Sequence, residues 1–175
     1  MPITGFSTVA LGTASVNITE ELAIVLSDVN ISFGNGTVSQ GALFAILEST
    51  GAAAVNGTWA AVNDPFILEN DGNVLANVTI KASLSAAAWF GGNAGYALMY
   101  YNYSNYEASA CLLNGQGNLA FVTIPVDPST SVTCQKLNFT DSSDQIRLDL
   151  KIQIPSDAAP GLKENSITFT STQSV

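Results

Sequence analysis

The stretch IRLDLKIQI, residues 146–154, alternates strictly between apolar and polar side chains. Successive side chains of a strand point to opposite faces of a sheet, so this pattern predicts a β-strand with one dry face and one wet face. The isoleucines and leucines share the dry face, whereas Arg147, Asp149, Lys151 and Gln153 share the wet face. Residues 74–81 alternate in the same way, with Asn77 on the wet face.

Short runs of β-branched and aromatic residues, separated by turn residues, continue on both sides of this stretch. Residues 70–73 contain an Asp-Gly pair, which predicts positive φ in a turn between two strands. Residues 86–90 are the one helix candidate and are too few to change the class. The pattern predicts an all-β sandwich or barrel. The expected strands are residues 21–26, 29–33, 41–48, 65–70, 74–82, 95–101, 107–113, 118–125, 146–154 and 165–171.

The charge balance excludes several classes of function. Five Lys and Arg residues face 14 Asp and Glu residues, for a net charge of −9. This balance excludes a basic footprint for nucleic acid and a basic patch for anionic lipid. The chain has no histidine, which excludes Ser–His or Cys–His nucleophile pairs and His-ligated zinc. No apolar run approaches the roughly 20 residues of a membrane-spanning helix.

Asparagine is placed unusually along the chain. Seven asparagines occupy N-x-Ser/Thr sequons, well above chance for this Ser and Thr content. Such sequons are glycosylation sites in an exported protein, which predicts an extracellular or cell-surface location. The alternative is that Asn-x-Thr is simply common at strand ends of Thr-rich β proteins. The sequon residues are Asn17, Asn30, Asn35, Asn56, Asn77, Asn102 and Asn138.

The two cysteines, Cys111 and Cys134, also favour export. Without histidine they do not complete a structural zinc site, and their separation is not that of a C-x-x-C redox motif. In an oxidising compartment we expect one disulfide between them, and the alternative is two buried free thiols. Residues 1–16 do not have the composition of a signal peptide. Either a leader has been removed from this sequence, or Met1 belongs to the processed chain.

The first 19 residues differ from the rest of the chain. They contain no charged side chain, and they include the apolar residues Ile3, Phe6, Val9 and Leu11. A terminal arm is normally polar, whereas this one is apolar enough to favour burial. It is therefore either the first strand of its own sheet or a strand added to the sheet of a neighbouring subunit. We divide the chain into an N-terminal arm, residues 1–19, and a sandwich domain, residues 20–175.

Two motifs resemble those of a known family. Residues 65–80 carry the sequence ENDGN followed by spaced apolar residues, and residues 152–161 carry IQIPSDAAPG, followed by ITFT at 167–170. Both are similar to motifs of TasA/camelysin-like secreted fibre subunits and of archaeal bundling pilins. The segment from Gly5 to Ala14 is loosely similar to their N-terminal segment. The resemblance covers about 45 of the 175 residues and does not include residues 83–140.

The resemblance implies a jelly-roll or Ig-like sandwich that polymerises head to tail. In such proteins the N-terminal donor strand of one subunit completes the sheet of the next and builds pili or biofilm matrix, sometimes with lateral bundling. A head-to-tail contact that does not close on itself generates a filament. On this interpretation the donor side chains are Ile3, Phe6, Val9 and Leu11, the partner is a second copy of the chain, and no cofactor is expected.

An enzyme is a much weaker hypothesis. The densest acidic positions are Glu20-Glu21 and the pair Asp141 and Asp144. Glu20 and Glu21 are adjacent and would face opposite ways on a strand, whereas a glycosidase needs two carboxyls across a cleft. Residues 141–144, and Asp71 with Asn73, are alternatives for calcium, but neither matches an EF-hand loop. We expect solvated loops there, and neither a metal site nor catalysis.

All five tyrosines fall within residues 96–106. Exposed tyrosines stack on sugar rings, so the second hypothesis is a monomeric cell-surface glycan-binding adhesin or an S-layer-associated domain. The alternative is a tyrosine-rich strand at a subunit interface, where tyrosine is enriched. Glycosylation of Asn102, inside the cluster, argues against a free binding face. The tyrosines are Tyr96, Tyr100, Tyr101, Tyr103 and Tyr106.

Overall fold

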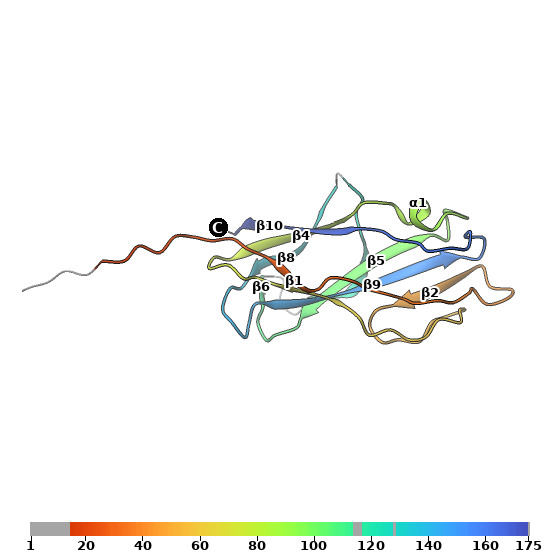
Figure 1. The fold of residues 1–175 in the computed structure, drawn as a ribbon, viewed down its shortest axis with the longest axis horizontal. Helices are drawn as coiled ribbons and strands as arrows, with labels where there is room; N and C mark the ends of the chain where they lie inside the picture. Colours follow the sequence, from red (N-terminus) through yellow and green to blue (C-terminus); the bar gives the residue numbers. More distant parts are fainter. Residues whose placement is uncertain (1–14, 114–116, 128, 175) are drawn as a thin grey trace, which may run out of the picture.

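The computed structural model describes residues 15–113, 117–127 and 129–174, with residues 117–119 described through their backbone alone. The described residues form ten strands and one short helix. The strands make two antiparallel sheets packed face to face, so the predicted all-β sandwich is confirmed (Figure 1). The predicted donor residues Ile3, Phe6, Val9 and Leu11 lie outside the described part of the chain.

The larger sheet is built around β9, Gln145–Pro155. On one side β9 pairs with β5, and on the other it pairs with β3 at its beginning and with β2 at its end. We call this the large sheet, and its order is β1-β3-β9-β5-β7. Its other strands are β1 (Val25–Asp28), β2 (Phe44–Glu48), β3 (Phe66–Glu69), β5 (Leu98–Asn105) and β7 (Gly117–Thr123).

The second sheet has four strands in the order β10-β4-β8-β6, and we call it the small sheet. Its strand β4 carries the predicted alternation of residues 74–81, with Asn77 on the outer face. The strands are β4 (Ala76–Ala82), β6 (Cys111–Leu113), β8 (Ser131–Leu137) and β10 (Ile167–Gln173).

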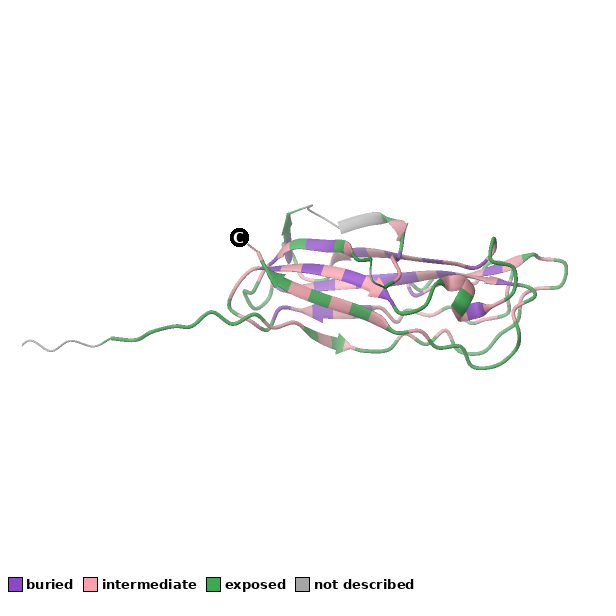
Figure 2. Ribbon diagram, turned by 90° about the horizontal axis from the view of Figure 1, so that it is seen from above, coloured by how far each residue is buried: buried purple, intermediate pink, exposed green. Residues whose placement is uncertain are grey.

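The hydrophobic core lies between the two sheets. Ile146, Leu148, Leu150 and Ile152 of β9 are all buried there, as their alternation predicts. Buried and less buried residues alternate along the strands, which is the pattern of a sheet with one covered face (Figure 2). Asp149, expected on the wet face, is only 6% exposed. The Arg147 guanidinium and the Ser49 hydroxyl both donate hydrogen bonds to its carboxylate, which compensates for the burial.

Two strand predictions were wrong. Residues 29–33 form no strand, because side chains satisfy their backbone: Asp64 Oδ2 accepts from Ser32 N at 3.0 Å. Strand β8 was not predicted, because its alternation is irregular. Thr133 and Cys134 are both buried, and the pairing with β4 shifts register on both sides of Val78. A bulged strand of mixed composition has no clear period of two.

The predicted helix is confirmed as α1, Ala86–Phe90. Ser85 precedes it as the N-cap, and its hydroxyl accepts a hydrogen bond from Ala88 N at 3.2 Å. Gly91, with φ of 72°, ends the helix in a conformation that glycine adopts most easily. No helix among the described residues is long and apolar enough to cross a membrane.

Candidate functional site: the arm root and the open side of the sandwich

The N-terminal arm is fixed to the sandwich at Thr19 and Glu21, which we call the arm root. Asn73 binds both residues: its Nδ2 donates to Thr19 O at 2.8 Å, and its Oδ1 accepts from Glu21 N at 2.7 Å. The backbone N–H of Asn73 also donates to Glu21 O at 2.9 Å. One asparagine therefore holds three backbone groups of the arm, with its own amide and its peptide N–H.

Gly72 makes this attachment sterically possible. A Cβ at Gly72 would collide with the carbonyl oxygen of Glu21. The sequence predicted positive φ here, in a turn between two strands, and that prediction was wrong. Strands β3 and β4 belong to different sheets, so residues 70–75 cross between sheets rather than reversing a hairpin. Glycine is needed for close approach of another backbone rather than for a left-handed conformation.

Asn70 organises the same turn from inside the core. It is 1% exposed, and its Nδ2 donates to Val74 O at 2.9 Å and to Leu137 O at 3.2 Å. Its Oδ1 accepts from Gly72 N at 3.2 Å. The ENDGN motif thus supports the arm root through two asparagines. Asn70 holds the turn from the core side, and Asn73 binds the backbone of Thr19 and Glu21.

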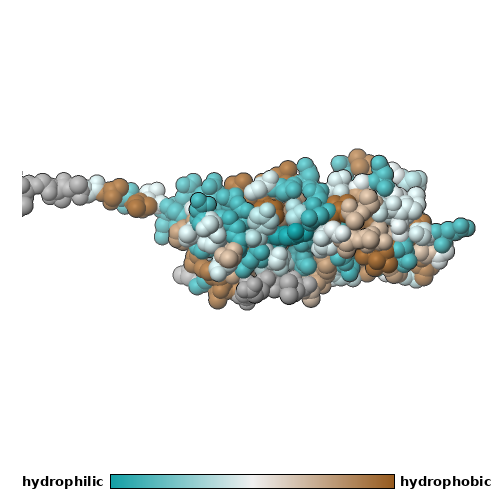
Figure 3. Space-filling model, turned by 90° about the horizontal axis from the view of Figure 1, so that it is seen from below, coloured by the Kyte–Doolittle hydropathy of each residue, from teal (hydrophilic) through white to brown (hydrophobic). Residues whose placement is uncertain are grey.

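Beyond its root, the described part of the arm carries exposed apolar side chains. Val16 is 87% exposed and Ile18 is 80% exposed. The segment that leaves the body carries brown, hydrophobic residues in Figure 3. Glu20 Oε2 accepts a hydrogen bond from Gln173 Nε2 at 3.1 Å, so the arm root lies beside the end of β10. Residues 15–19 lead away from the sandwich there (Figure 1).

A groove of about 1080 Å³ opens between residues 26–38 and residues 154–167. Its floor is apolar and comes from the inner face of the large sheet. Lys163 and Glu164 are the only charged residues among the described residues that line it. The two lining segments run at the end of the sandwich remote from the arm root (Figure 1). The floor residues include Leu47, Phe66, Leu150 and Ile152.

Aromatic rings line the walls of the groove. Trp59 packs so closely against Gly36 and Gly57 that a Cβ at either glycine would meet its ring. Trp89 and Phe90 of α1 stack with their ring centroids 4.3 Å apart, and both line the groove. Trp89 Nε1 is buried without a hydrogen-bond acceptor among the described residues. Large apolar surface lined by aromatic rings is typical of a binding groove.

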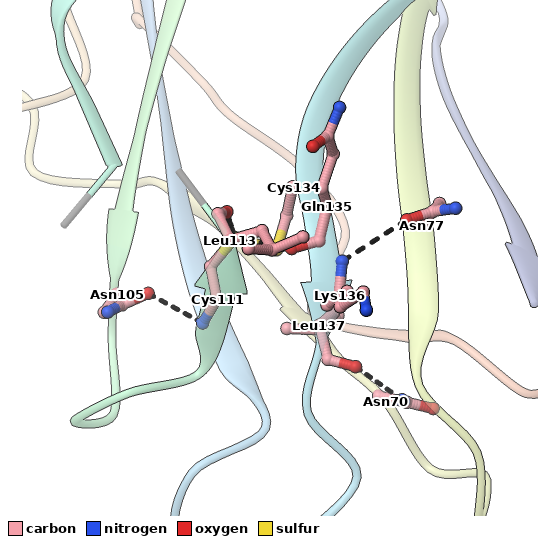
Figure 4. The surroundings of a disulfide bond; sticks show 9 residues. All are labelled: Asn70, Asn77, Asn105, Cys111, Leu113, Cys134, Gln135, Lys136 and Leu137. Atoms are coloured by element: carbon pink, nitrogen blue, oxygen red, sulfur yellow. Dashed lines mark hydrogen bonds between the residues drawn. A yellow bond between two sulfur atoms is a disulfide. The ribbon is translucent and has the colours of Figure 1, made fainter. Parts of the chain in front are cut away.

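The disulfide between Cys111 and Cys134 is confirmed. It joins the neighbouring strands β6 and β8, with the Cα atoms 5.8 Å apart (Figure 4). Asn105 Oδ1 accepts from Cys111 N at 2.9 Å, and Asn77 Oδ1 accepts from Lys136 N at 3.3 Å. The disulfide thus stabilises the short edge strand β6 on the small sheet. A disulfide is compatible with an oxidising compartment.

None of the seven sequon asparagines is buried in the structure. Four are exposed, and three are half-buried. Among the half-buried ones, Asn138 Nδ2 donates to Ser143 Oγ at 2.9 Å, so the nitrogen that would carry a glycan is already engaged. Asn77 and Asn102 point from the outer faces of the two sheets. The exposed ones are Asn17, Asn30, Asn35 and Asn56.

The tyrosines do not form one exposed platform. Tyr101 and Tyr103 are buried in the core, where the Tyr101 hydroxyl donates to Ser131 Oγ at 3.1 Å. Burial and the neighbouring Tyr101 raise the pKa of Tyr103 above its usual range. Tyr100 is half-buried on the outer face, and Tyr106 is 60% exposed. The alternation of β5 separates Tyr100 from Tyr101 and Tyr103, and Tyr96 and Tyr106 lie outside this strand. The five rings therefore do not share one face.

The acidic residues also separate into different environments. Asp144 is 5% exposed rather than solvated, whereas Asp141 and Asp71 are exposed. Burial, a hydrogen bond with Glu107 and the nearby carboxylates raise the pKa of Asp144 to about 6. No group of three or more metal-ligating side chains occurs among the described residues. The carboxylate of Glu107 accepts hydrogen bonds from the backbone N–H groups of Asp144 and Gln145. The described residues show no cleft with two opposed carboxyls.

No protein-family model matches the chain, and no curated protein matches it.

Proposed function

We propose that this protein is the subunit of an extracellular filament, a pilus or biofilm matrix fibre of the TasA/camelysin-like kind, which polymerises head to tail through its N-terminal arm. One observation carries the proposal: the apolar arm is anchored at one end of the sandwich, and a nearly uncharged groove with an apolar floor opens at the other. This arrangement favours a donor and an acceptor on every subunit. When one end of each subunit binds the opposite end of the next, and the contact does not close into a ring, the subunits form an open filament.

The chemistry of the two partners agrees with this function. Residues 1–19 contain no charged side chain, and the groove lining is almost uncharged. An extended peptide that adds to a sheet edge gains backbone hydrogen bonds, and its apolar side chains fill the pockets. The disulfide and the exposed sequons that lie outside the groove, Asn17 and Asn56, support an exported and glycosylated protein.

The test is electron microscopy of the native secreted protein and of a variant that lacks residues 1–14. We expect uniform filaments from the native protein and discrete monomers from the truncated one. Two full-length variants test whether assembly requires the apolar side chains of the arm and not only its length. Serine at Ile3, Phe6, Val9 and Leu11 is expected to abolish assembly, whereas serine at Thr4, Thr8 and Thr13 is expected to preserve it.

Two results would contradict the proposal. Filaments formed without residues 1–14 would show that the arm is not the donor. Discrete monomers from the native protein would favour the adhesin hypothesis, and glycan binding through the outward-facing Tyr100 and Tyr106 would then be measured.

A further inference from the structure

The two sheets of the sandwich differ in width. Phe66 of β3 and Phe169 of β10 pack edge to face, with centroids 5.6 Å apart, so β10 lies over β3. The Tyr101–Ser131 hydrogen bond places β8 over β5. The large sheet continues past β3 to β1, whereas the small sheet ends at β10. Among the described residues, no strand of the small sheet therefore lies over β1.

Side chains around this position are only half covered. Leu26 of β1 and Ile167 and Phe169 of β10 all point toward the core, yet each remains partly exposed. The corresponding inward residues of the central strands, such as Ile80 and Leu148, are fully buried. The groove begins at this position, since both Leu26 and Ile167 line it. Leu26, Ile167 and Phe169 thus lie where a further strand beside β10 would cover them.

Among the described strands, β10 pairs only with β4, so its other edge is free and offers unpaired backbone groups. Ser83 N donates to Ser166 O, and Ser174 N donates to Leu75 O. The ladder between β10 and β4 has no register shift, and hydrogen-bonded pairs alternate along it. Thr168, Thr170 and Thr172 therefore bond to β4. The N–H and C=O groups of Ile167, Phe169 and Ser171 point away from β4, to the open edge.

Other edges are less suited to accept a strand. Strand β1 has four residues, contains Asp28 and has an irregular register, and β6 has three residues. Strand β7, the other outer strand of the large sheet, has seven residues, but its pairing with β5 shifts register between Tyr101 and Tyr103. Strand β10 has seven residues with no charge, proline or bulge. Natural proteins usually protect long edges with charges, prolines or bulges, and an unprotected edge is a template for pairing. β10 lacks all of these protections.

We propose that residues 3–12 of a second copy of this chain pair with the free edge of β10, antiparallel to it, and complete the small sheet opposite β1. The inference rests on the proposed function, which it deepens by naming the acceptor strand. As a strand, ten residues span about 33 Å, against about 23 Å for the seven residues of β10. The donor is thus long enough to cover this edge and to enter the groove beyond Ile167.

The direction follows from the placement of the arm. Residues 15–19 of the arm leave the sandwich at the end where β10 finishes and run away from the body (Figure 1). In a head-to-tail stack, the second copy lies beyond that end, and its groove end faces the arm. The arm then enters with its N-terminus leading, toward the end of β10 in that copy. Head-to-tail stacking therefore requires antiparallel pairing, whereas an arm folded back on its own β10 would run parallel.

The side-chain pattern of the arm suggests a register. In a strand, Ile3, Val9 and Leu11 share one face, and Phe6 lies on the other. With the first set inward, the small residues Gly5 and Ser7 lie beside the Phe169 ring, and Val9 lies beside Ile167. Thr4 and Thr8 then lie outward, beside Thr172 and Thr168.

The first test removes one backbone donor of the free edge. Ser171→Pro eliminates an N–H that faces the open edge and leaves the bonds to β4 intact, and proline is tolerated on such edges. We expect a folded monomer that forms no filaments and binds a synthetic peptide of residues 1–14 at least about tenfold more weakly than the wild type. Ser171→Ala, which keeps the N–H, is the matched control and is expected to assemble normally. Peptide binding is measured on chains that lack residues 1–14.

The second test uses cysteine pairs and remains informative if the proline variant fails to fold. Thr8→Cys with Thr168→Cys, and Thr4→Cys with Thr172→Cys, are expected to link subunits covalently on non-reducing gels. The swapped combinations are expected to give no link, since four residues of strand separate them. Links within one chain from the swapped pairs would show self-complementation and overturn the inference.

The outcomes separate the two proposals. Normal filaments from Ser171→Pro, or filaments without the expected links, would overturn the choice of β10 and leave the filament function standing. Filaments from the chain without residues 1–14 would overturn the filament function itself.

Discussion

Different kinds of interaction occur at the two ends of the sandwich. At the arm root, Asn70 and Asn73 satisfy several backbone groups, and a disulfide fastens β6 to β8 nearby. At the groove end, aromatic and aliphatic side chains line an open space of about 1080 Å³. Directional bonds fix the position of the arm root, whereas apolar surface accepts a partner with few geometric demands. We expect this difference between an end that fixes a chain segment in place and an end that binds one.

The largest effect is expected from Asn70→Ala at the anchor. The substitution leaves the C=O of the buried Leu137 and the backbone groups of the half-buried Gly72 and Val74 without their partners. A buried group left unpaired costs on the order of 1–3 kcal/mol, and a half-buried one costs less. We expect a loss of about 4 kcal/mol in the free energy of unfolding, measured by urea denaturation of the monomer.

Asn165→Ala is the matched control at the groove end. Asn165 also exchanges two hydrogen bonds with a backbone, that of Leu84, but it is only half-buried. We expect a loss of about 1 kcal/mol, because water replaces the missing bonds. Equal losses from the two variants would contradict the contrast between the ends.

Removal of the disulfide is expected to have the next largest effect. Replacing Cys111 and Cys134 with alanine opens a connection of 23 residues, and it costs about 3 kcal/mol because the unfolded chain gains freedom. The measurement is the shift in the urea midpoint, compared with the reduced wild type. We expect filament formation to persist at low temperature, since the acceptor edge β10 lies on the opposite side of the small sheet. Loss of assembly from a folded variant would link β6 to the acceptor.

A pH dependence is expected from Asp144. Its folded pKa, about 6, lies above its unfolded value, so its contribution to stability is complete below pH 4 and is lost as the pH rises through 6. Asp144→Asn keeps a neutral hydrogen-bond donor beside Glu107 and removes the buried charge. We expect the variant to gain about 2 kcal/mol relative to the wild type between pH 4 and pH 7.

Asp141→Asn is the control for this measurement, since Asp141 is exposed. It lowers the local negative charge without removing a buried carboxyl. We therefore expect the pH dependence of its free energy of unfolding to differ less from that of the wild type. An Asp144→Asn variant with the same pH profile as the wild type would show that this carboxyl titrates normally.

The smallest effect on stability is expected at the groove. Phe33→Ser removes a half-buried ring from the groove wall and costs the monomer about 1 kcal/mol. The same change is expected to weaken filament assembly strongly, as seen in the critical concentration for polymerisation. This variant is thus expected to keep nearly all its stability and to assemble poorly. The disulfide variant is expected to lose stability and still assemble. Normal assembly would place the donor strand away from Phe33.

Much of this architecture was predictable from local patterns. The alternation in residues 146–154 and 74–81 identified two central strands and their buried faces, because side chains of a strand alternate whatever the partner strands are. Ser85 and Gly91 bound the short helix that the sequence predicted. The disulfide was predictable since two cysteines and no histidine leave few other uses.

Other features depended on contacts between distant parts of the chain. Asp149 is buried because Ser49 and Arg147 meet it, and β8 is irregular because it bulges against β4. The tyrosine cluster disappears in space because β5 sends its rings to opposite faces. The ENDGN turn holds the arm root rather than a hairpin, because its two flanking strands belong to different sheets.

The sequence by itself determined the fold class, the disulfide and the apolar character of the arm, because each depends on residue type and short-range spacing. Only the tertiary structure decided that Asn73 and Gly72 anchor the arm, that the groove opens at the other end and that β10 has a free edge. These features depend on which strands pair and which sheet is wider. A local pattern shows which face of a strand is buried. Which distant strands pair depends on how the two sheets pack around the core.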